Sequence, residues 1–243
     1  MSREETLFFY NPFTRETINL PHLPEHDLRS NLRQLPKYYF SSSFCFSSLP
    51  TSADCIVFAI DESYFSRPRR ITVYFITRGK QVWDIFDFEN AMQYTPLCNS
   101  PILHQGSFYS VDYNGLVGTF SLEDNIWKVH GTPRDIYNDT YRYPSFLAKN
   151  GDDLLLVKLG CEAKLVRIYK LNIPVMDWVE VESLGKPMLF ISRTSCVSAV
   201  APNSEMENKI YFPRLCFNGE GILFYSLETG RYDSFGVSIL LRI

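Results

Sequence analysis

The residues best placed for chemistry in this sequence are two neighbouring histidines, His22 and His26, with Glu25 between them. Two histidines four apart on one helical face, with a glutamate directly after the first, can bind zinc and activate a water molecule. Here Leu23 follows His22, and Pro24 disrupts a helix. We therefore interpret this segment as a solvated loop and expect no metal site.

Serines, carboxylates and glycines give no better catalytic pattern. The motif GxSxG is absent, so Ser192, Ser195 and Ser198 lack the sharp turn that exposes a nucleophilic hydroxyl. No glycine-rich phosphate loop occurs. The acidic pairs Glu123–Asp124 and Asp152–Asp153 fall where hairpin turns are expected, and turn chemistry explains them. The sequence therefore predicts that the protein is not an enzyme and needs no cofactor.

A basic stretch is a candidate for binding rather than catalysis. Arg67, Arg69 and Arg70 lie in an expected loop. Guanidinium groups form paired hydrogen bonds to carboxylates and phosphates, so this stretch is a candidate site for an acidic or phosphorylated protein partner. An ordinary solvated turn is the other interpretation.

Three tyrosines form a second candidate surface. Tyr137, Tyr141 and Tyr143 lie close together in a loop rich in Asp and Asn. Tyrosine and arginine are the residue types over-represented at the energetic centres of protein interfaces. A contact with a partner and a partly buried packing role are both consistent with this pattern.

Composition and charge narrow the function classes. The formal net charge is −3 and the charges are scattered, which argues against a general nucleic-acid surface. No apolar run has the length of a membrane span, and the charged N-terminus does not resemble a signal peptide. None of the six cysteines lies in a CxxC pair, so buried free thiols are favoured. We expect a cytoplasmic or nuclear protein without membrane or nucleic-acid partners.

The stretch 102–129 shows which elements would position these residues. It reads as four short strands, Ile102–His104, Ser107–Asp112, Leu116–Ser121 and Ile126–Val129, joined by polar turns. Asn and Gly tolerate the positive φ that tight hairpin turns need. Four antiparallel strands joined in this way are typical of one blade of a β-propeller.

The hairpin formed by the last two strands of that stretch recurs along the chain. Each copy has an apolar or aromatic strand, a polar turn and a second strand with an apolar anchor. The turns are about 45 to 65 residues apart, against roughly 40 to 50 in known blade repeats, and the other copies are Leu7–Leu20, Val73–Phe86, Val166–Val181 and Ile222–Phe235. The repeat predicts an all-β, single-domain propeller over residues 1–243, with about five four-stranded blades, of which one can be incomplete. An unrelated antiparallel sandwich is the alternative.

Closure of the ring is a further expectation. Leu7–Tyr10 arrives without earlier strands of its own blade, and Val237–Leu241 is a spare apolar strand at the other end. Because unpaired strand edges promote aggregation, we expect the two ends to complete one sheet.

The chain resembles a plant family in its motifs and their order. FFYNPFTRETINLP is similar to the YNP-T-x-x-LP element of plant F-box proteins, and SSLPTSADCIVFAI, ILHQGSFYSVDYNGLVGTFSLEDNIW, MDWVEVESLG and NKIYFPRLCFNGEGILFYSLETGRYDSF follow in the same order. The family is the F-box/kelch-repeat class built on the domain of unknown function 295, or KIB-type β-propeller. The sequence lacks the Gly-Gly doublet of kelch repeats.

The resemblance implies a propeller that recognises protein substrates for an SCF-type ubiquitin ligase. Family members usually begin with an F-box that binds the ligase adaptor, and nothing of that kind precedes Leu7. The resemblance therefore implies an unknown protein substrate as partner, and adaptor binding only if an F-box is supplied. A ligase-independent binding protein or decoy is one alternative. A propeller hydrolase or lectin with an axial pocket is another.

Overall fold

Short antiparallel strands make up nearly all of the regular structure. In the described part of the chain the one helical element is a short 3-10 helix, Ser204–Met206. This confirms the all-β class that the sequence predicts. The computed structural model describes residues 7–23, 43–63, 68–96, 101–112, 114–131, 145–160, 166–192, 195–212 and 222–235.

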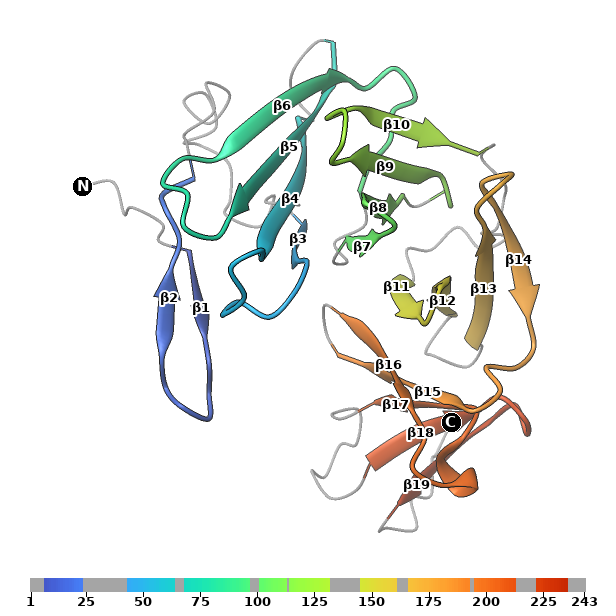
Figure 1. Ribbon diagram of the computed structural model, residues 1–243. Coiled ribbons are helices and arrows are strands. Elements are labelled where there is room, and N and C mark those ends of the chain that lie inside the picture. Colours follow the sequence, from blue (N-terminus) through green and yellow to red (C-terminus); the bar gives the residue numbers. More distant parts are fainter. Residues whose placement is uncertain are drawn as a thin grey trace, which may run out of the picture. The chain divides into compact units, whose positions relative to one another are not determined.

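The chain divides into two compact units, and Figure 1 labels and colours their strands along the sequence. The first consists of residues 1–112 and 118–129 and the second of residues 113–117 and 130–243. The strands of the first unit are β1 (Phe8–Tyr10), β2 (Thr17–Asn19), β3 (Ser43–Phe46), β4 (Ile56–Ser63), β5 (Arg70–Thr77), β6 (Asp84–Glu89), β7 (Ile102–His104), β8 (Ser107–Val111), β9 (Val117–Ser121) and β10 (Trp127–His130).

The second unit contains the remaining strands. They are β11 (Ser145–Asn150), β12 (Asp153–Leu159), β13 (Val166–Asn172), β14 (Asp177–Val181), β15 (Pro187–Ile191), β16 (Cys196–Val200), β17 (Lys209–Phe212), β18 (Ile222–Ser226) and β19 (Arg231–Phe235).

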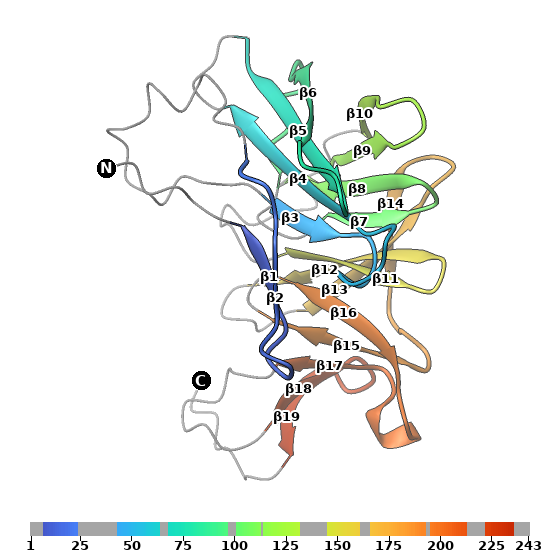
Figure 2. The ribbon, with the colours of Figure 1, turned by 60° about the vertical axis from the view of Figure 1, so that its left-hand side comes forward.

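These strands form five sheets, as many as the hairpin copies in the sequence. Three sheets have four strands in the orders β3-β4-β5-β6, β10-β9-β8-β7 and β11-β12-β13-β14. The hairpin β1–β2 is a sheet of two strands (Figure 2). The last sheet has five strands in the order β16-β15-β17-β18-β19 and contains a parallel pair, β15 with β17. It thus differs from the expected four-stranded blade, because β16 folds back along the outer edge of β15 and leaves β17 to pair with β15 directly.

Four of the hairpins share one loop geometry, which gives the repeat a physical basis. Each has a four-residue loop, as between the paired residues Asn172 and Asp177 or Ser226 and Arg231. The last loop residue has a positive φ in every case: 60° at Arg15, 55° at Asn125, 50° at Met176 and 64° at Gly230. A turn that ends in the left-handed region reverses the chain so that the strands keep their register.

The hairpin β5–β6 is the exception. Its last cross-strand pair is Phe75 with Asp84, which leaves an eight-residue loop. The N-terminal part of that loop still belongs to β5, because Ile76 and Thr77 pair with β4. The end of β5 therefore extends beyond the first residue of β6. In the loop that follows, Gly79 supplies the positive φ of 87° that the chain reversal needs.

Aromatic rings form much of the core of the first unit. Phe58 stacks on Phe108 with ring centroids 4.1 Å apart, and Phe120 lies against Phe58, Phe75 and Phe86 at 5.7–5.9 Å. Phe58, Phe108 and Phe120 are fully buried. These contacts hold sheet β3–β6 against sheet β7–β10, because offset and tilted rings pack densely while burying a large apolar area.

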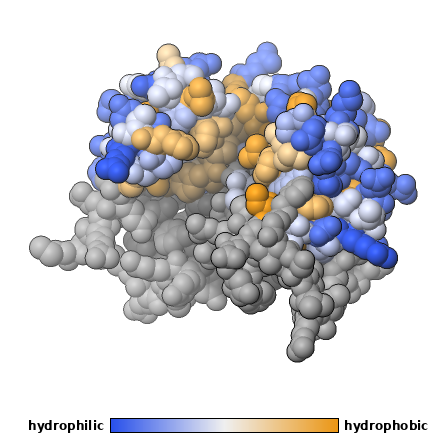
Figure 3. All heavy atoms as spheres, turned by 90° about the horizontal axis from the view of Figure 1, so that it is seen from below, coloured by the Kyte–Doolittle hydropathy of each residue, from blue (hydrophilic) through white to orange (hydrophobic). Residues whose placement is uncertain are grey.

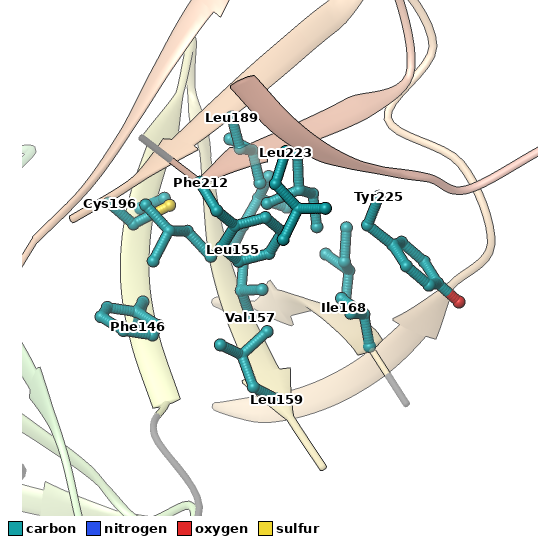
Figure 4. Packing of buried hydrophobic residues seen from close by; sticks show 14 residues of the cluster. Phe146, Leu155, Val157, Leu159, Ile168, Leu189, Cys196, Phe212, Leu223 and Tyr225 are labelled. Carbon is teal, nitrogen blue, oxygen red and sulfur yellow. The ribbon is translucent and has the colours of Figure 1, made fainter. Parts of the chain in front are cut away.

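The core of the second unit is mainly aliphatic. Side chains from β11–β14 meet those of the five-stranded sheet, among them Leu155, Val157, Ile168, Leu189 and Ile210. Figure 4 shows labelled side chains of this cluster pointing toward one another from the facing strands. Burial of such branched side chains contributes about 1.5–3 kcal/mol each.

The expectation of ring closure lies partly outside the described residues. Val237–Leu241 belongs to the range 236–243, which the structure does not describe. The pairing of this strand with the first hairpin stays a prediction, as does the single-domain organisation.

Candidate interaction surface

Of the binding residues that the sequence predicts, the structure describes two. Arg67, Tyr137, Tyr141 and Tyr143 lie outside the described residues. Arg69 and Arg70 are described, and the chain uses them differently. Arg70 begins β5, is exposed and pairs in register with Glu89 of β6.

Arg69 neutralises a buried carboxylate. Its Nη1 lies 3.5 Å from Oε1 of Glu62, whose side chain is 1% exposed, whereas that of Arg69 is 32% exposed. Asn90 Nδ2 donates to the same Oε1 at 3.3 Å. Burial raises the pKa of Glu62, and hydrogen bonds from Thr95 and the Arg69 charge partly oppose this. Arg69 therefore has a structural task at the base of β5, which the sequence analysis did not foresee.

A buried polar network continues from Asn90. Its Nδ2 donates to the backbone oxygen of Tyr94 at 2.7 Å, and its Oδ1 accepts from Tyr94 N at 2.8 Å. The Tyr94 hydroxyl lies 2.6 Å from Ser110 Oγ in β8. Burial raises the pKa of Tyr94 well above its usual value. This network fixes the segment between β6 and β7 and leaves no group of it exposed for a partner.

The hairpin β1–β2 presents aromatic side chains on two faces. Phe9 and Ile18 are cross-strand partners, and Phe9 packs against the core of sheet β3–β6. Phe8 and Tyr10 point to the opposite face, where about half of each side chain is exposed. Phe13 at the turn is 95% exposed. Contiguous exposed apolar side chains on a folded protein mark interaction sites.

A pocket lies between this hairpin and the long β5–β6 loop. Its volume is about 320 Å³, and its walls come from Phe9, Ile18, Asn19, Leu20, Pro21, Pro50, Cys55, Val57, Ile76, Thr77, Arg78, Gly79, Lys80 and Gln81. The indole of Trp83 holds the hairpin in place, because its Nε1 donates to the Pro21 backbone oxygen at 3.0 Å. The loop that departs from the repeat geometry is thus the loop that builds the pocket.

Positively charged side chains line the pocket, and exposed apolar residues adjoin its lining in the chain. Leu49 and Val82, at 71% and 72% exposure, are the chain neighbours of the lining residues Pro50 and Gln81. Lys80 Nζ pairs with Asp84 Oδ2 at 3.0 Å. Within the described ranges no carboxylate pairs with Arg78, whose side chain is exposed. Figure 3, a view of one face of the molecule coloured by residue hydropathy, shows hydrophobic residues exposed among hydrophilic ones.

The sequence reasoning missed this surface, although a signal for it was present. In LFFYNPF, consecutive aromatic residues place apolar side chains on both faces of a strand. A strand in a two-stranded sheet with only one covered face does not need the second apolar face for folding. That excess of aromatic residues was the available indication of a binding surface.

In the described part of the chain, no group of three or more His, Cys, Asp or Glu side chains is arranged to hold a metal ion. No helix in that part is long and apolar enough to cross a membrane. Cys45, Cys55 and Cys196 are buried free thiols, and burial raises the pKa of Cys196 to about 12.

Comparison with known proteins gives a consistent set of relatives. An F-box/kelch-repeat protein of Arabidopsis thaliana is 29% identical over 238 residues, which cover 96% of this chain and 62% of the relative. An F-box protein of the same plant is 27% identical over 207 residues, covering 85% of this chain and 39% of the relative. The chain thus spans about two fifths to three fifths of the length of these relatives.

The family itself is defined by the propeller. Residues 1–233 match the family described as KIB1-4 beta-propeller. The five sheets, the recurring hairpin loops and the absence of α-helix among the described residues are all consistent with that fold. This chain belongs to the KIB1-4 beta-propeller family.

Proposed function

We propose that this chain is a protein-binding propeller that recognises a target protein, as the substrate-recognition part of an F-box ubiquitin-ligase subunit does. The observation that carries the proposal is the exposed aromatic surface of hairpin β1–β2, formed by Phe8, Tyr10 and Phe13, while the opposite face of the hairpin lines an apolar pocket through Phe9 and Ile18. Tyr and Phe are typical of the centres of protein interfaces. Relatives named as F-box proteins support the same class of function.

Affinity purification tests the binding half of the proposal. The tagged chain is used as bait in a plant extract, beside a variant that carries Phe8→Ser and Tyr10→Ser. Both side chains are exposed on the outer face of the hairpin, so the variant should keep its circular dichroism spectrum. We expect mass spectrometry to find proteins that the wild-type chain retains and the variant loses. Identical sets of retained proteins from the two baits would contradict the proposal for this face.

The contribution of the arginine stretch to target binding is tested with an arginine variant in the same capture experiment. Changing Arg67 and Arg70 together to Ala should weaken capture by about 1–3 kcal/mol for each charged contact that is lost, and Arg69 is kept because it pairs with the buried Glu62. Unchanged capture would remove only this stretch from the site.

The chain alone should fail to retain the ligase adaptor, whereas a fusion to the F-box of a relative should retain it. Adaptor binding by the unfused chain would contradict this division of roles.

A further inference from the structure

The pocket beside the β5–β6 loop has the form of a peptide site. We propose that it binds a bulky apolar side chain of a partner protein, and that Arg78 pairs with a carboxylate directly next to that side chain in the partner's sequence. This inference rests on the proposed protein-binding function and names the class of segment recognised. The occupant is therefore an extended peptide with an aromatic or large aliphatic residue beside Asp or Glu.

The size and lining of the pocket support an apolar side chain. A volume of 320 Å³ lies at the lower end of the range for ligand pockets, about 300–1,000 Å³. Phe9, Ile18, Leu20, Val57 and Ile76 supply apolar walls. The hydrogen bond from Trp83 Nε1 to the backbone oxygen of Pro21 fixes the wall that the hairpin contributes. The pocket is thus preformed, so a side chain entering it loses little energy to rearrangement of the protein.

The rim supports a peptide that continues beyond the pocket. Leu49 and Val82 are exposed apolar side chains whose chain neighbours line the pocket. A peptide that extended from the pocket toward these positions would cover apolar surface that a small molecule filling the pocket would leave in water. Covering such surface would exclude water from the central contact, as the surroundings of interface hot spots do.

The charge at the rim supports an acidic neighbour. Lys80 is already paired with Asp84, while the Arg78 backbone N is fixed by a 2.8 Å hydrogen bond to the Cys55 oxygen. The loop is therefore anchored, and the guanidinium is exposed beside the mouth. An arginine in this position can form two parallel hydrogen bonds with a carboxylate.

Three synthetic peptides test the proposal by isothermal titration calorimetry. The first is acetyl-Gly-Ser-Phe-Asp-Ser-Gly-amide, and the other two replace Phe by Ala or Asp by Asn. We expect the Phe-Asp peptide to bind best. Loss of the carboxylate should weaken binding about tenfold, for a lost charged hydrogen bond, and loss of the ring should weaken it by roughly tenfold or more. Equal affinities, or no binding by any peptide, would overturn the proposal.

Matched variants assign the contact to Arg78. Arg78→Glu should weaken Phe-Asp binding about tenfold or more and favour a Phe-Lys peptide instead, because reversing one charge restores attraction to the opposite one. Lys128→Glu makes the same charge change at another exposed position of the same unit and should leave affinity within about twofold. Similar effects of the two variants would show that net charge, rather than Arg78, governs binding.

A variant whose own side chain fills the pocket distinguishes peptide binding in the pocket from the proposed protein-binding function. Ile18→Trp should abolish peptide binding by occupying the pocket, with the thermal midpoint reporting on folding. If target proteins are captured normally by Arg78→Glu while the peptides do not bind, the pocket proposal fails and protein binding stands. If the peptides bind as expected and no target is captured from extracts, the pocket assignment stands and the proposed target recognition fails.

Discussion

Two sheet-to-sheet contacts, one in each unit, are packed by different chemistry. Sheets β3–β6 and β7–β10 meet through stacked and tilted phenylalanine rings, next to the polar network of Glu62, Asn90 and Tyr94. Sheet β11–β14 meets the five-stranded sheet through branched aliphatic side chains. The first contact combines large rigid rings with directional bonds, whereas the described side chains of the second are mainly aliphatic.

This difference indicates which of the two contacts tolerates substitutions of its side chains. Rings that touch three or four other rings cannot be shortened without leaving a large cavity, and a buried charge cannot lose its partner without a desolvation cost. Aliphatic cores of conserved volume accept substitution at a lower cost. We therefore expect the contact in the first unit to be specific and fragile, and the one in the second to be permissive.

The largest expected effect is at the centre of the aromatic contact. Phe120→Ala removes a fully buried ring that contacts Phe58, Phe75 and Phe86. The free energy of unfolding should fall by about 3–5 kcal/mol, measured by chemical denaturation. A loss below roughly 1 kcal/mol would mean that the ring cluster is no more specific than the aliphatic one.

The next effect concerns the buried carboxylate. Arg69→Ala leaves Glu62 without its ion-pair partner and should lower the free energy of unfolding by about 1–3 kcal/mol, since a charged group is left underpaired. The neighbouring Arg70→Ala serves as the control, because its side chain is exposed, and its effect should stay within about 0.5 kcal/mol. Equal losses from both variants would remove the structural role assigned to Arg69.

A conservative change in the second unit provides the matching measurement. Ile168→Val deletes one methylene from a fully buried position of the aliphatic cluster and should cost about 0.5–1.5 kcal/mol. The same denaturation experiment reports the result. A cost near that of Phe120→Ala would erase the distinction between a fragile and a permissive contact.

The smallest expected effect is a dependence on pH. Because the pKa of Glu62 is raised in the folded protein, its contribution to stability is present below the unfolded pKa and is lost as pH rises through the folded value. Glu62→Gln cannot ionise, so the stability difference between this variant and the wild type should shift in the variant's favour on going from acidic to neutral pH. A difference that is constant with pH would show that Glu62 titrates normally.

The sequence predicted the strands far better than the site. The four strands expected in 102–129 lie within a residue of β7–β10, because turn residues and alternating apolar residues are local signals. The pocket depends on the β5–β6 loop meeting a hairpin that is some 60 residues earlier in the chain, and no local pattern reports such a contact. The ion pair of Arg69 with Glu62 has another reason: the two residues flank the connection between β4 and β5, and the sequence does not show which carboxylate an arginine meets until the register of the two strands is known.

The shared four-residue loop has a consequence for how this chain can vary. Each loop is written with the residue that precedes it: NPFTR, SLEDN, NIPVM and SLETG. SLEDN and SLETG share their first three residues and NPFTR and NIPVM share only the first, while the last residue differs in all four. All four loops nevertheless end in the same backbone conformation. Loop length, not loop chemistry, sets which face of the following strand is buried. Substitutions in these loops should therefore leave the fold intact, whereas deletion of one residue should exchange the inner and outer sides of the following strand. The repeat is thus clear in the backbone conformation and weak in the sequence.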